Sequence, residues 1–146
     1  GIFGLSFKEN TDDIRESVSI RLIKHLLKQK CIIFTHDPKA IDNTIEIFAD
    51  KITYCKKIDD VFRLSDCAVL MTPWDNYKKI TSRQIKKLKK KLFIDTRRIL
   101  KIDDKEIIFI SLGVGENESY DNFLNSSKKL MLCLLTKKIN KSYLKR

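Results

Sequence analysis

The sequence predicts an α/β domain in which a mostly parallel sheet carries helices on both faces. Short, largely apolar runs alternate along the chain with segments whose apolar residues recur at helical spacing. The apolar runs are too short to cross a membrane and lack the in–out alternation of a half-exposed sheet, as expected for buried parallel strands. With 146 residues, four glycines and two prolines, the chain has the length of one domain and no flexible linker. We therefore expect a Rossmann-like three-layer domain.

The strands are predicted from these apolar runs. Each run is four to eight residues long and most end at a charged residue or proline. The expected strands lie at 2–7, 31–38, 51–55, 67–72, 91–96 and 106–113.

The helices are predicted between the strands. The segment 14–28 has apolar residues three and four positions apart, and Asp12 and Asp13 are the expected capping residues at its start. Further helices are expected at 40–49, 57–66 and 82–90.

Two parts of the chain differ in composition. Residues 1–115 hold the predicted α/β domain, whereas residues 116–146 have no acidic residue after Asp121 and form a basic extension that we expect to be helical. Since Gly1 already lies inside a predicted strand, we expect the chain to be cut from a longer protein.

The net charge of +11 raises the question of a nucleic-acid partner. We consider this unlikely, because the basic run 83–91 reads as the solvated face of one helix and has no interleaved aromatic residues for base stacking. The four cysteines form no CxxC pair, so no metal site is expected, and buried reduced thiols in a cytoplasmic protein are the default. No run is long enough for a membrane span.

Ligands of parallel sheets bind where strands end and helices begin. Charged groups follow three predicted strands there, at 8–15, 36–38 and 95–98. If the strands before Lys8 and Arg97 approach one another, both cations can grip one pyrophosphate, arginine in a bidentate manner and lysine as a point charge. The alternative is that Lys8 forms an ordinary surface ion pair. Arg15 needs a counterion, either Asp12 or a ligand phosphate.

Other polar residues near these strand ends have structural readings. Asp37 occupies the place of a ribose-binding acid, but Pro38 and the incomplete glycine pattern of Gly1 and Gly4 favour a structural turn aspartate. His36 is expected to be a polar strand-end residue, and Trp74 either a partly buried edge aromatic or a ligand contact.

Several motifs resemble one family in order and spacing over residues 1–112. "GLSFKENTDDIRES" is similar to the G-L-A-F-K-x-x-T-D-D-x-R-E-S pattern that opens the C-terminal, UDP-binding domain of the UDP-glucose/GDP-mannose dehydrogenase family. "HDPKA", "SDCAVLMTPWDNYKKI" and "FIDTRRIL" follow in the family's order. The basic extension has no counterpart.

The resemblance implies an NAD-dependent enzyme, of the UDP-glucose 6-dehydrogenase kind, that oxidises C6 of a nucleotide sugar to a uronate through a cysteine-bound intermediate. It implies that Phe7, Lys8 and Arg97 contact the UDP-sugar and that Arg15 reaches the NAD. NAD itself would be held mainly by an N-terminal domain outside this chain. The expected partners are that domain, the central domain and, in the parent enzyme, a second copy forming a homodimer.

The sequence also departs from the family. None of its cysteines has the family's glycine-rich context, so we expect no catalytic residue in this fragment and no activity from it alone. Ser6 replaces another small residue and His36 a more usual aromatic. The alternatives are a UDP-N-acetylmannosamine or GDP-mannose dehydrogenase domain, a non-enzymatic nucleotide-binding module, or a module that binds nucleic acid through its basic tail.

Overall fold

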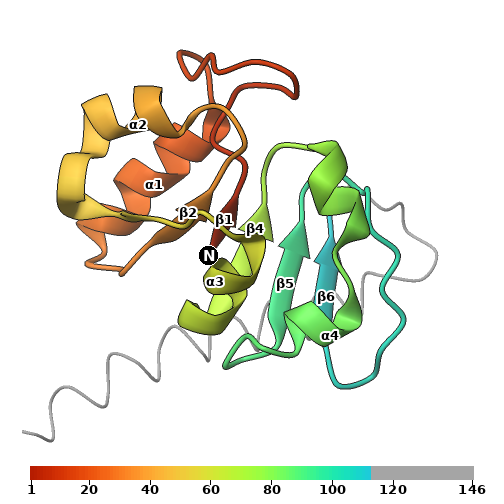
Figure 1. Cartoon of the computed structure of the whole chain (residues 1–146). Helices are drawn as coiled ribbons and strands as arrows, with labels where there is room; N and C mark the ends of the chain where they lie inside the picture. Colours follow the sequence, from red (N-terminus) through yellow and green to blue (C-terminus); the bar gives the residue numbers. More distant parts are fainter. Residues whose placement is uncertain (113–146) are drawn as a thin grey trace, which may run out of the picture. The chain divides into compact units, whose positions relative to one another are not determined.

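The computed structural model describes residues 1–112 and contains a six-stranded, fully parallel sheet with strand order β3-β2-β1-β4-β5-β6 (Figure 1). The predicted α/β fold is confirmed. The expected basic extension at 116–146 and Cys133 lie outside the described residues. The strands are β1 (Ile2–Phe3), β2 (Phe34–His36), β3 (Thr53–Tyr54), β4 (Cys67–Leu70), β5 (Leu92–Asp95) and β6 (Ile108–Ser111).

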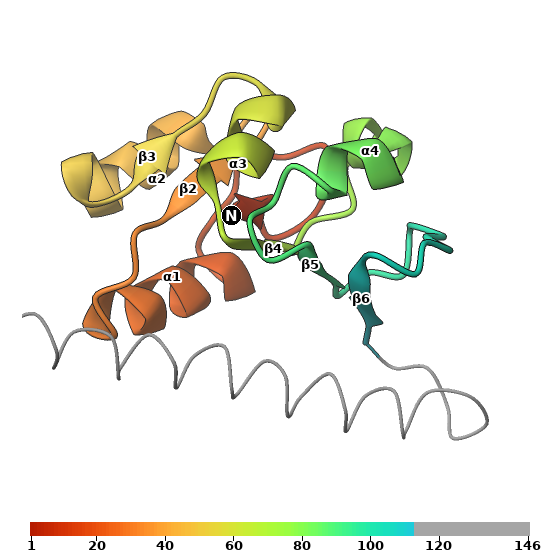
Figure 2. The ribbon, with the colours of Figure 1, turned by 90° about the horizontal axis from the view of Figure 1, so that it is seen from below.

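The helices cover both faces of this sheet. They are α1 (Val18–Lys28), α2 (Ile41–Phe48), α3 (Ile58–Leu64) and α4 (Ser82–Ile85), with 3₁₀ turns η1 (Ala49–Lys51) and η2 (Asp75–Lys79). Figure 2 shows α1 on one side of the sheet and α3 and α4 on the other. Within residues 1–112 no helix is long and apolar enough to cross a membrane.

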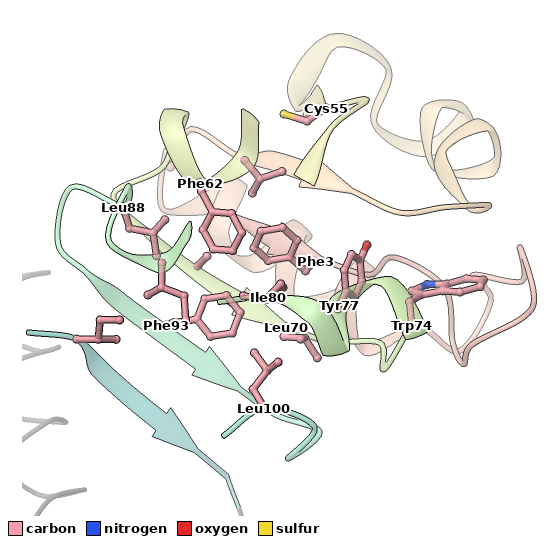
Figure 3. Close-up of a cluster of buried hydrophobic side chains, with 14 residues drawn as sticks. Phe3, Cys55, Phe62, Leu70, Trp74, Tyr77, Ile80, Leu88, Phe93 and Leu100 are labelled. Carbon is pink, nitrogen blue, oxygen red and sulfur yellow. The ribbon is translucent and has the colours of Figure 1, made fainter. Parts of the chain in front are cut away.

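Two hydrophobic cores fill the space on either side of the sheet. Because side chains alternate along a strand, Ile2 of β1 joins the core beneath α1 and α2, whereas Phe3 joins the core beneath α3 and α4. Figure 3 shows the second core, in which the rings of Phe3, Phe62 and Phe93 lie together. Their ring centroids are 4.8 to 6.0 Å apart, within the range of favourable aromatic pairs.

Some elements are shorter than predicted. The first strand ends at Phe3 because Gly4 has a φ of 93° and leaves the extended conformation. The expected helix at 82–90 ends at Ile85, since the amides of Lys87 and Leu88 donate to carbonyls three residues back instead of four. The next two amides donate to the carbonyls of Ser65 and Asp66.

The helix predicted at 14–28 begins only at Val18, so the expectation that Asp12 and Asp13 cap it is wrong. Ser17 is the residue before the helix, and its hydroxyl donates to the carbonyl of Leu5 at 2.6 Å. The Asp13 carboxylate instead accepts hydrogen bonds from Arg15. Because the helix begins at Val18, Arg15 precedes it and does not lie in its first turn.

Candidate nucleotide site at the carboxyl edge of the sheet

The candidate site lies where β1, β4 and β5 end. β4 pairs with β1 on one side and with β5 on the other, and all strands are parallel, so the loops after these three strands share one edge (Figure 1). Neighbouring strands are about 4.8 Å apart, so β1 and β5 are separated by about 10 Å. The strands before Lys8 and Arg97 do approach one another, with β4 between them.

The loop after β1 is held tightly against the end of β4. Gly4 has a φ of 93°, and a Cβ atom there would lie 2.4 Å from the Cβ of Thr72. The Thr72 hydroxyl donates to the carbonyl of Ser6 at 2.8 Å. Gly4 is therefore required by close packing and backbone conformation, and Gly1 and Gly4 are not a phosphate-binding turn of the dinucleotide type.

Phe7 and Lys8 are presented to solvent by this loop. The amide of Phe7 donates to the carbonyl of Asp13 at 2.8 Å, which closes the loop, while 48% of the Phe7 residue surface remains exposed. Within residues 1–112 the Lys8 ammonium makes no hydrogen bond or ion pair. An exposed aromatic ring beside an unpaired cation is a surface that a nucleotide can cover.

Arg97 lies in the loop after β5, and the end of β4 holds its side chain. Its Nε donates to the carbonyl of Met71 at 2.6 Å, and its backbone amide donates to Oδ1 of Asp95 at 2.8 Å. Among the described residues, its two terminal nitrogens have no partner. They are therefore available for the two-pronged contact that arginine makes with phosphate oxygens.

Arg15 forms an ion pair with Asp13. Its Nη2 lies 2.7 Å from Oδ2 of Asp13, and the arginine side chain is 86% exposed. The hydrogen bonds from Arg15 are the main reason that the pKa of Asp13 falls to about 2, and the charge of Lys8 adds to this effect. The sequence analysis left Asp12 and a ligand phosphate open as the counterion of Arg15, and within the chain the counterion is Asp13.

Asp37 is a structural turn residue, as predicted. Its carboxylate is buried and accepts hydrogen bonds from the loop after β1 and from the first amides around α2. The indole Nε1 of Trp74 donates to Oδ2 of Asp37 at 3.1 Å, and Trp74 is only 6% exposed. Figure 3 shows Trp74 beside Tyr77 at one end of the core, so Trp74 is a buried residue rather than an edge aromatic.

His36 is also part of this buried network. Its Nδ1 lies 2.9 Å from the hydroxyl of Tyr77, and that hydroxyl donates to the carbonyl of His36 at 2.7 Å. Because the single hydroxyl proton is used in the second bond, Nδ1 carries the proton that is donated in the first. Burial lowers the pKa of His36, which favours this neutral form.

Asp95 has a role that the sequence reasoning missed. Its carboxylate is fully buried and accepts from the amides of the four residues that follow Thr96, namely Arg97, Arg98, Ile99 and Leu100. The available signal was its likeness to Asp37, because both are aspartates directly at the end of a buried strand. Aspartates in such places bond to amides two or more residues on.

Within residues 1–112 no cysteine lies at the carboxyl ends of β1, β4 and β5, where the candidate site is. Cys31 precedes β2 and Cys67 begins β4, so both are at the opposite edge, and Cys67 is exposed where we expected a buried thiol. Cys55 is buried, and burial raises the pKa of its thiol, the reverse of an activated nucleophile. Within residues 1–112 no cluster of metal-ligating side chains is present.

Four of the six cations in the basic run 83–91 are paired with acidic neighbours. Ion pairs join the ammonium groups of Lys86, Lys87, Lys89 and Lys91 to Asp104, Glu106, Asp59 and Asp66. Cations paired in this way are poorly suited to neutralise a nucleic-acid backbone.

An open depression of about 430 Å³ lies beside the loop after β1 and is lined by Asn10, Thr11, Asp12 and Lys39.

Known proteins are similar to this chain in sequence and in fold. The model of the UDP-glucose/GDP-mannose dehydrogenase family, UDP binding domain, matches residues 1–102. A UDP-glucose 6-dehydrogenase of Rickettsia bellii is 32% identical over 109 residues, which are 73% of this chain and 25% of the relative. A UDP-N-acetyl-D-mannosamine dehydrogenase of Methanococcus vannielii is 34% identical over 103 residues, covering 68% of this chain and 22% of the relative.

A solved UDP-glucose dehydrogenase from Pyrobaculum islandicum superimposes with a TM-score of 0.61 at 27% identity, over 75% of this chain and 24% of that one. The chain thus spans about a quarter of the length of the curated relatives that it matches. The motifs that carried the resemblance, including the loop of Phe7 and Lys8 and the "FIDTRRIL" segment, lie within or overlap the matched region. This chain belongs to the UDP-glucose/GDP-mannose dehydrogenase family and contains the family's UDP binding domain.

Proposed function

We propose that this chain supplies the UDP-sugar-binding part of an NAD-dependent dehydrogenase that oxidises C6 of a nucleotide sugar to a uronate. The observation that carries the proposal is the arrangement of Lys8 and Arg97 on either side of the end of β4. Within residues 1–112 the Lys8 ammonium and the two terminal nitrogens of Arg97 have no partner, and a diphosphate between them could contact both. Phe7 would add an apolar contact to the ligand.

Arg15 is proposed to serve the NAD side. It lies on the same loop as Lys8, its side chain is almost fully exposed, and Asp13 holds its guanidinium in place. NAD would accept the hydride from the substrate and would be bound mainly by a domain outside this chain. In such an enzyme the loop 7–15 would lie between substrate and cofactor.

We propose that the parent enzyme is a homodimer and that it supplies the catalytic cysteine together with an N-terminal and a central domain. The described cysteines lie away from the proposed site or have a raised thiol pKa, so the nucleophile would come from the rest of the parent enzyme. Reduced thiols fit a cytoplasmic protein.

Titration of the 146-residue chain with UDP and UDP-glucose in a calorimeter tests the proposal. We expect saturable binding of both, and no heat at millimolar ligand would overturn it. UDP-N-acetylmannosamine is one comparison ligand, because a UDP-N-acetyl-D-mannosamine dehydrogenase is similar to the chain, and GDP is another, because the family includes GDP-mannose dehydrogenases. Weaker binding of GDP than of UDP would point away from a GDP-mannose enzyme.

A non-enzymatic module that has lost its ligand is the alternative. It is disfavoured by the Lys8 ammonium and the two terminal nitrogens of Arg97, which have no partner within residues 1–112, since a site that no longer binds has no need of unpaired donors. Binding of nucleic acid through the basic run around α4 is disfavoured by the ion pairs there, and the basic tail of the other alternative lies outside the described residues.

A further inference from the structure

Two buried carboxylates lie behind the proposed nucleotide site. Asp37 follows β2 and is 2% exposed, and Asp95 ends β5 and is 0% exposed. Within residues 1–112 neither forms an ion pair with a cation. Asp37 accepts hydrogen bonds from N–H and O–H donors, and Asp95 accepts them from backbone N–H donors. A buried carboxylate without a counterion must be stabilised by such donors, so the groups around each one are fixed in place.

The Asp37 carboxylate organises the loop that leads to Lys8. Its Oδ2 accepts from the amide of Leu5 at 2.7 Å, the amide of Ser6 at 3.2 Å and the Ser6 hydroxyl at 3.3 Å. The same oxygen accepts from Nε1 of Trp74 at 3.1 Å. Its Oδ1 binds two amides at the start of α2. One carboxylate therefore joins the loop after β1, the loop after β4 and the helix after β2.

The Asp95 carboxylate does the same for Arg97. Oδ1 accepts from the amides of Arg97 and Arg98 at 2.8 and 2.9 Å, and Oδ2 accepts from the next two amides at 2.9 Å each. These bonds hold Arg98 at a φ of 55°, which L residues rarely adopt. The turn brings the Arg97 side chain over β4, where Nε reaches the carbonyl of Met71.

We propose that Asp37 and Asp95 are paired positioning residues of the nucleotide site: Asp37 sets the place of Lys8, and Asp95 sets the place of Arg97. The inference rests on the proposed function, because it assumes that these two cations bind the diphosphate. It adds a division of labour, in which each buried carboxylate acts through one cation and not through the other.

Asparagine is the informative replacement at both positions. It keeps the size and shape of aspartate, but its NH₂ group is a donor and would face amide donors on one side. In Asp37→Asn this conflict falls on the loop 5–6 or on the start of α2. In Asp95→Asn it falls on the amides of the loop 97–100. With its NH₂ group in the place of Oδ2, Asp37→Asn disturbs the loop that leads to Lys8. In either orientation Asp95→Asn disturbs the loop that carries Arg97, and neither change creates a cavity.

Crossed double-mutant cycles on UDP affinity, measured by calorimetry on the 146-residue chain, test the division. We expect Asp37→Asn to weaken UDP binding about tenfold in the wild-type background and in Arg97→Ala, but by no more than about twofold in Lys8→Ala. Asp95→Asn should show the reverse pattern, with its effect lost in Arg97→Ala and kept in Lys8→Ala. A merely structural role would weaken binding equally in both backgrounds.

Equal losses in both backgrounds would overturn the inference while UDP binding by the wild-type chain upheld the proposed function. Absence of UDP binding by the wild-type chain would overturn both. If Asp37→Asn does not fold, Trp74→Phe and Ser6→Ala replace it, since each removes one donor to Oδ2 of Asp37. Their smaller losses should likewise disappear in Lys8→Ala, and losses that persist there would overturn the inference.

Discussion

The Nε of Arg97 donates a hydrogen bond to the main-chain carbonyl of Met71, directly after β4. The same strand end bonds to the loop after β1, through the hydroxyl of Thr72 and the carbonyl of Ser6. The end of β4 is thus the common support of the loops that carry Lys8 and Arg97. Two cations from non-adjacent strands can be fixed relative to each other because one strand lies between them and binds both loops.

Lys8→Ala and Arg97→Ala should each weaken UDP binding by about tenfold or more, because each removes a charge-assisted contact to phosphate. Arg97→Lys should recover little, since lysine keeps the charge but loses the planar fork and the Nε bond to Met71. Calorimetric titration measures the three affinities. Lys24→Ala, an exposed lysine of α1, is the matched control and should leave the affinity unchanged. A loss below about 1 kcal/mol in both alanine variants would contradict phosphate contacts.

Gly4→Ala should destabilise the domain by about 2 kcal/mol or more, because it combines an unfavourable φ with a steric clash. The added methyl group would lie 2.4 Å from the Cβ and 2.6 Å from the backbone nitrogen of Thr72, at a φ of 93°. Urea unfolding followed by Trp74 fluorescence gives the free energy of unfolding. The exposed Glu46→Ala in α2 serves as control, with an expected change within about 0.5 kcal/mol. Equal stability of both variants would show that the turn relaxes without cost.

The free energy of unfolding should fall as the pH is lowered through about 6.5, the usual pKa of histidine. His36 has a lowered pKa in the folded protein because it is buried, so the unfolded chain takes up a proton first and is favoured as the pH falls. The stabilisation is complete above the usual value and is lost below it. Urea unfolding between pH 5 and 8 measures the slope.

His36→Phe should reduce this dependence, because it removes the titrating ring and keeps a buried aromatic side chain. The remaining slope comes from the Gly1 ammonium, whose pKa burial lowers to about 6. The hydroxyl of Tyr77 can still donate to the carbonyl of residue 36, which is a main-chain group. His25→Ala, on the exposed side of α1, should leave the slope as it is. If His25→Ala removed the slope and His36→Phe did not, the assignment to His36 would be wrong.

The order of strands and helices was predictable because it depends on local patterns, such as the run at 67–72 that contains β4. The ends of elements were less predictable. The helix predicted from residue 14 begins at Val18 because Asp13 bonds to Arg15 and Ser17 bonds to the carbonyl of Leu5, and the second contact joins segments twelve residues apart. Contacts of that kind are absent from a local reading.

The site was predictable in its cations and not in its supports. Lys8 and Arg97 stand out as charges after apolar runs, and Asp37 as a turn residue. The bond from Arg97 to Met71 depends on β4 lying between β1 and β5, which is a property of the sheet and not of any one segment. The bond from Trp74 to Asp37 likewise joins residues 37 positions apart.

Arg15→Ala should separate the two halves of the proposed site. Arg15 is paired with the half-buried carboxylate of Asp13, whose pKa of about 2 keeps it ionised throughout the physiological range, so the guanidinium has a permanent counterion within the chain and does not need the diphosphate for one. We expect UDP affinity of the chain to stay within about twofold, and the KM for NAD of the full-length parent enzyme to rise about tenfold or more. Arg21→Ala on α1 is the control for a lost surface charge. The contrary outcome is a loss of UDP affinity as large as that of Lys8→Ala, with the KM for NAD unaltered. Arg15 would then contact the substrate and not the cofactor, because a residue that contacts the diphosphate must affect UDP affinity.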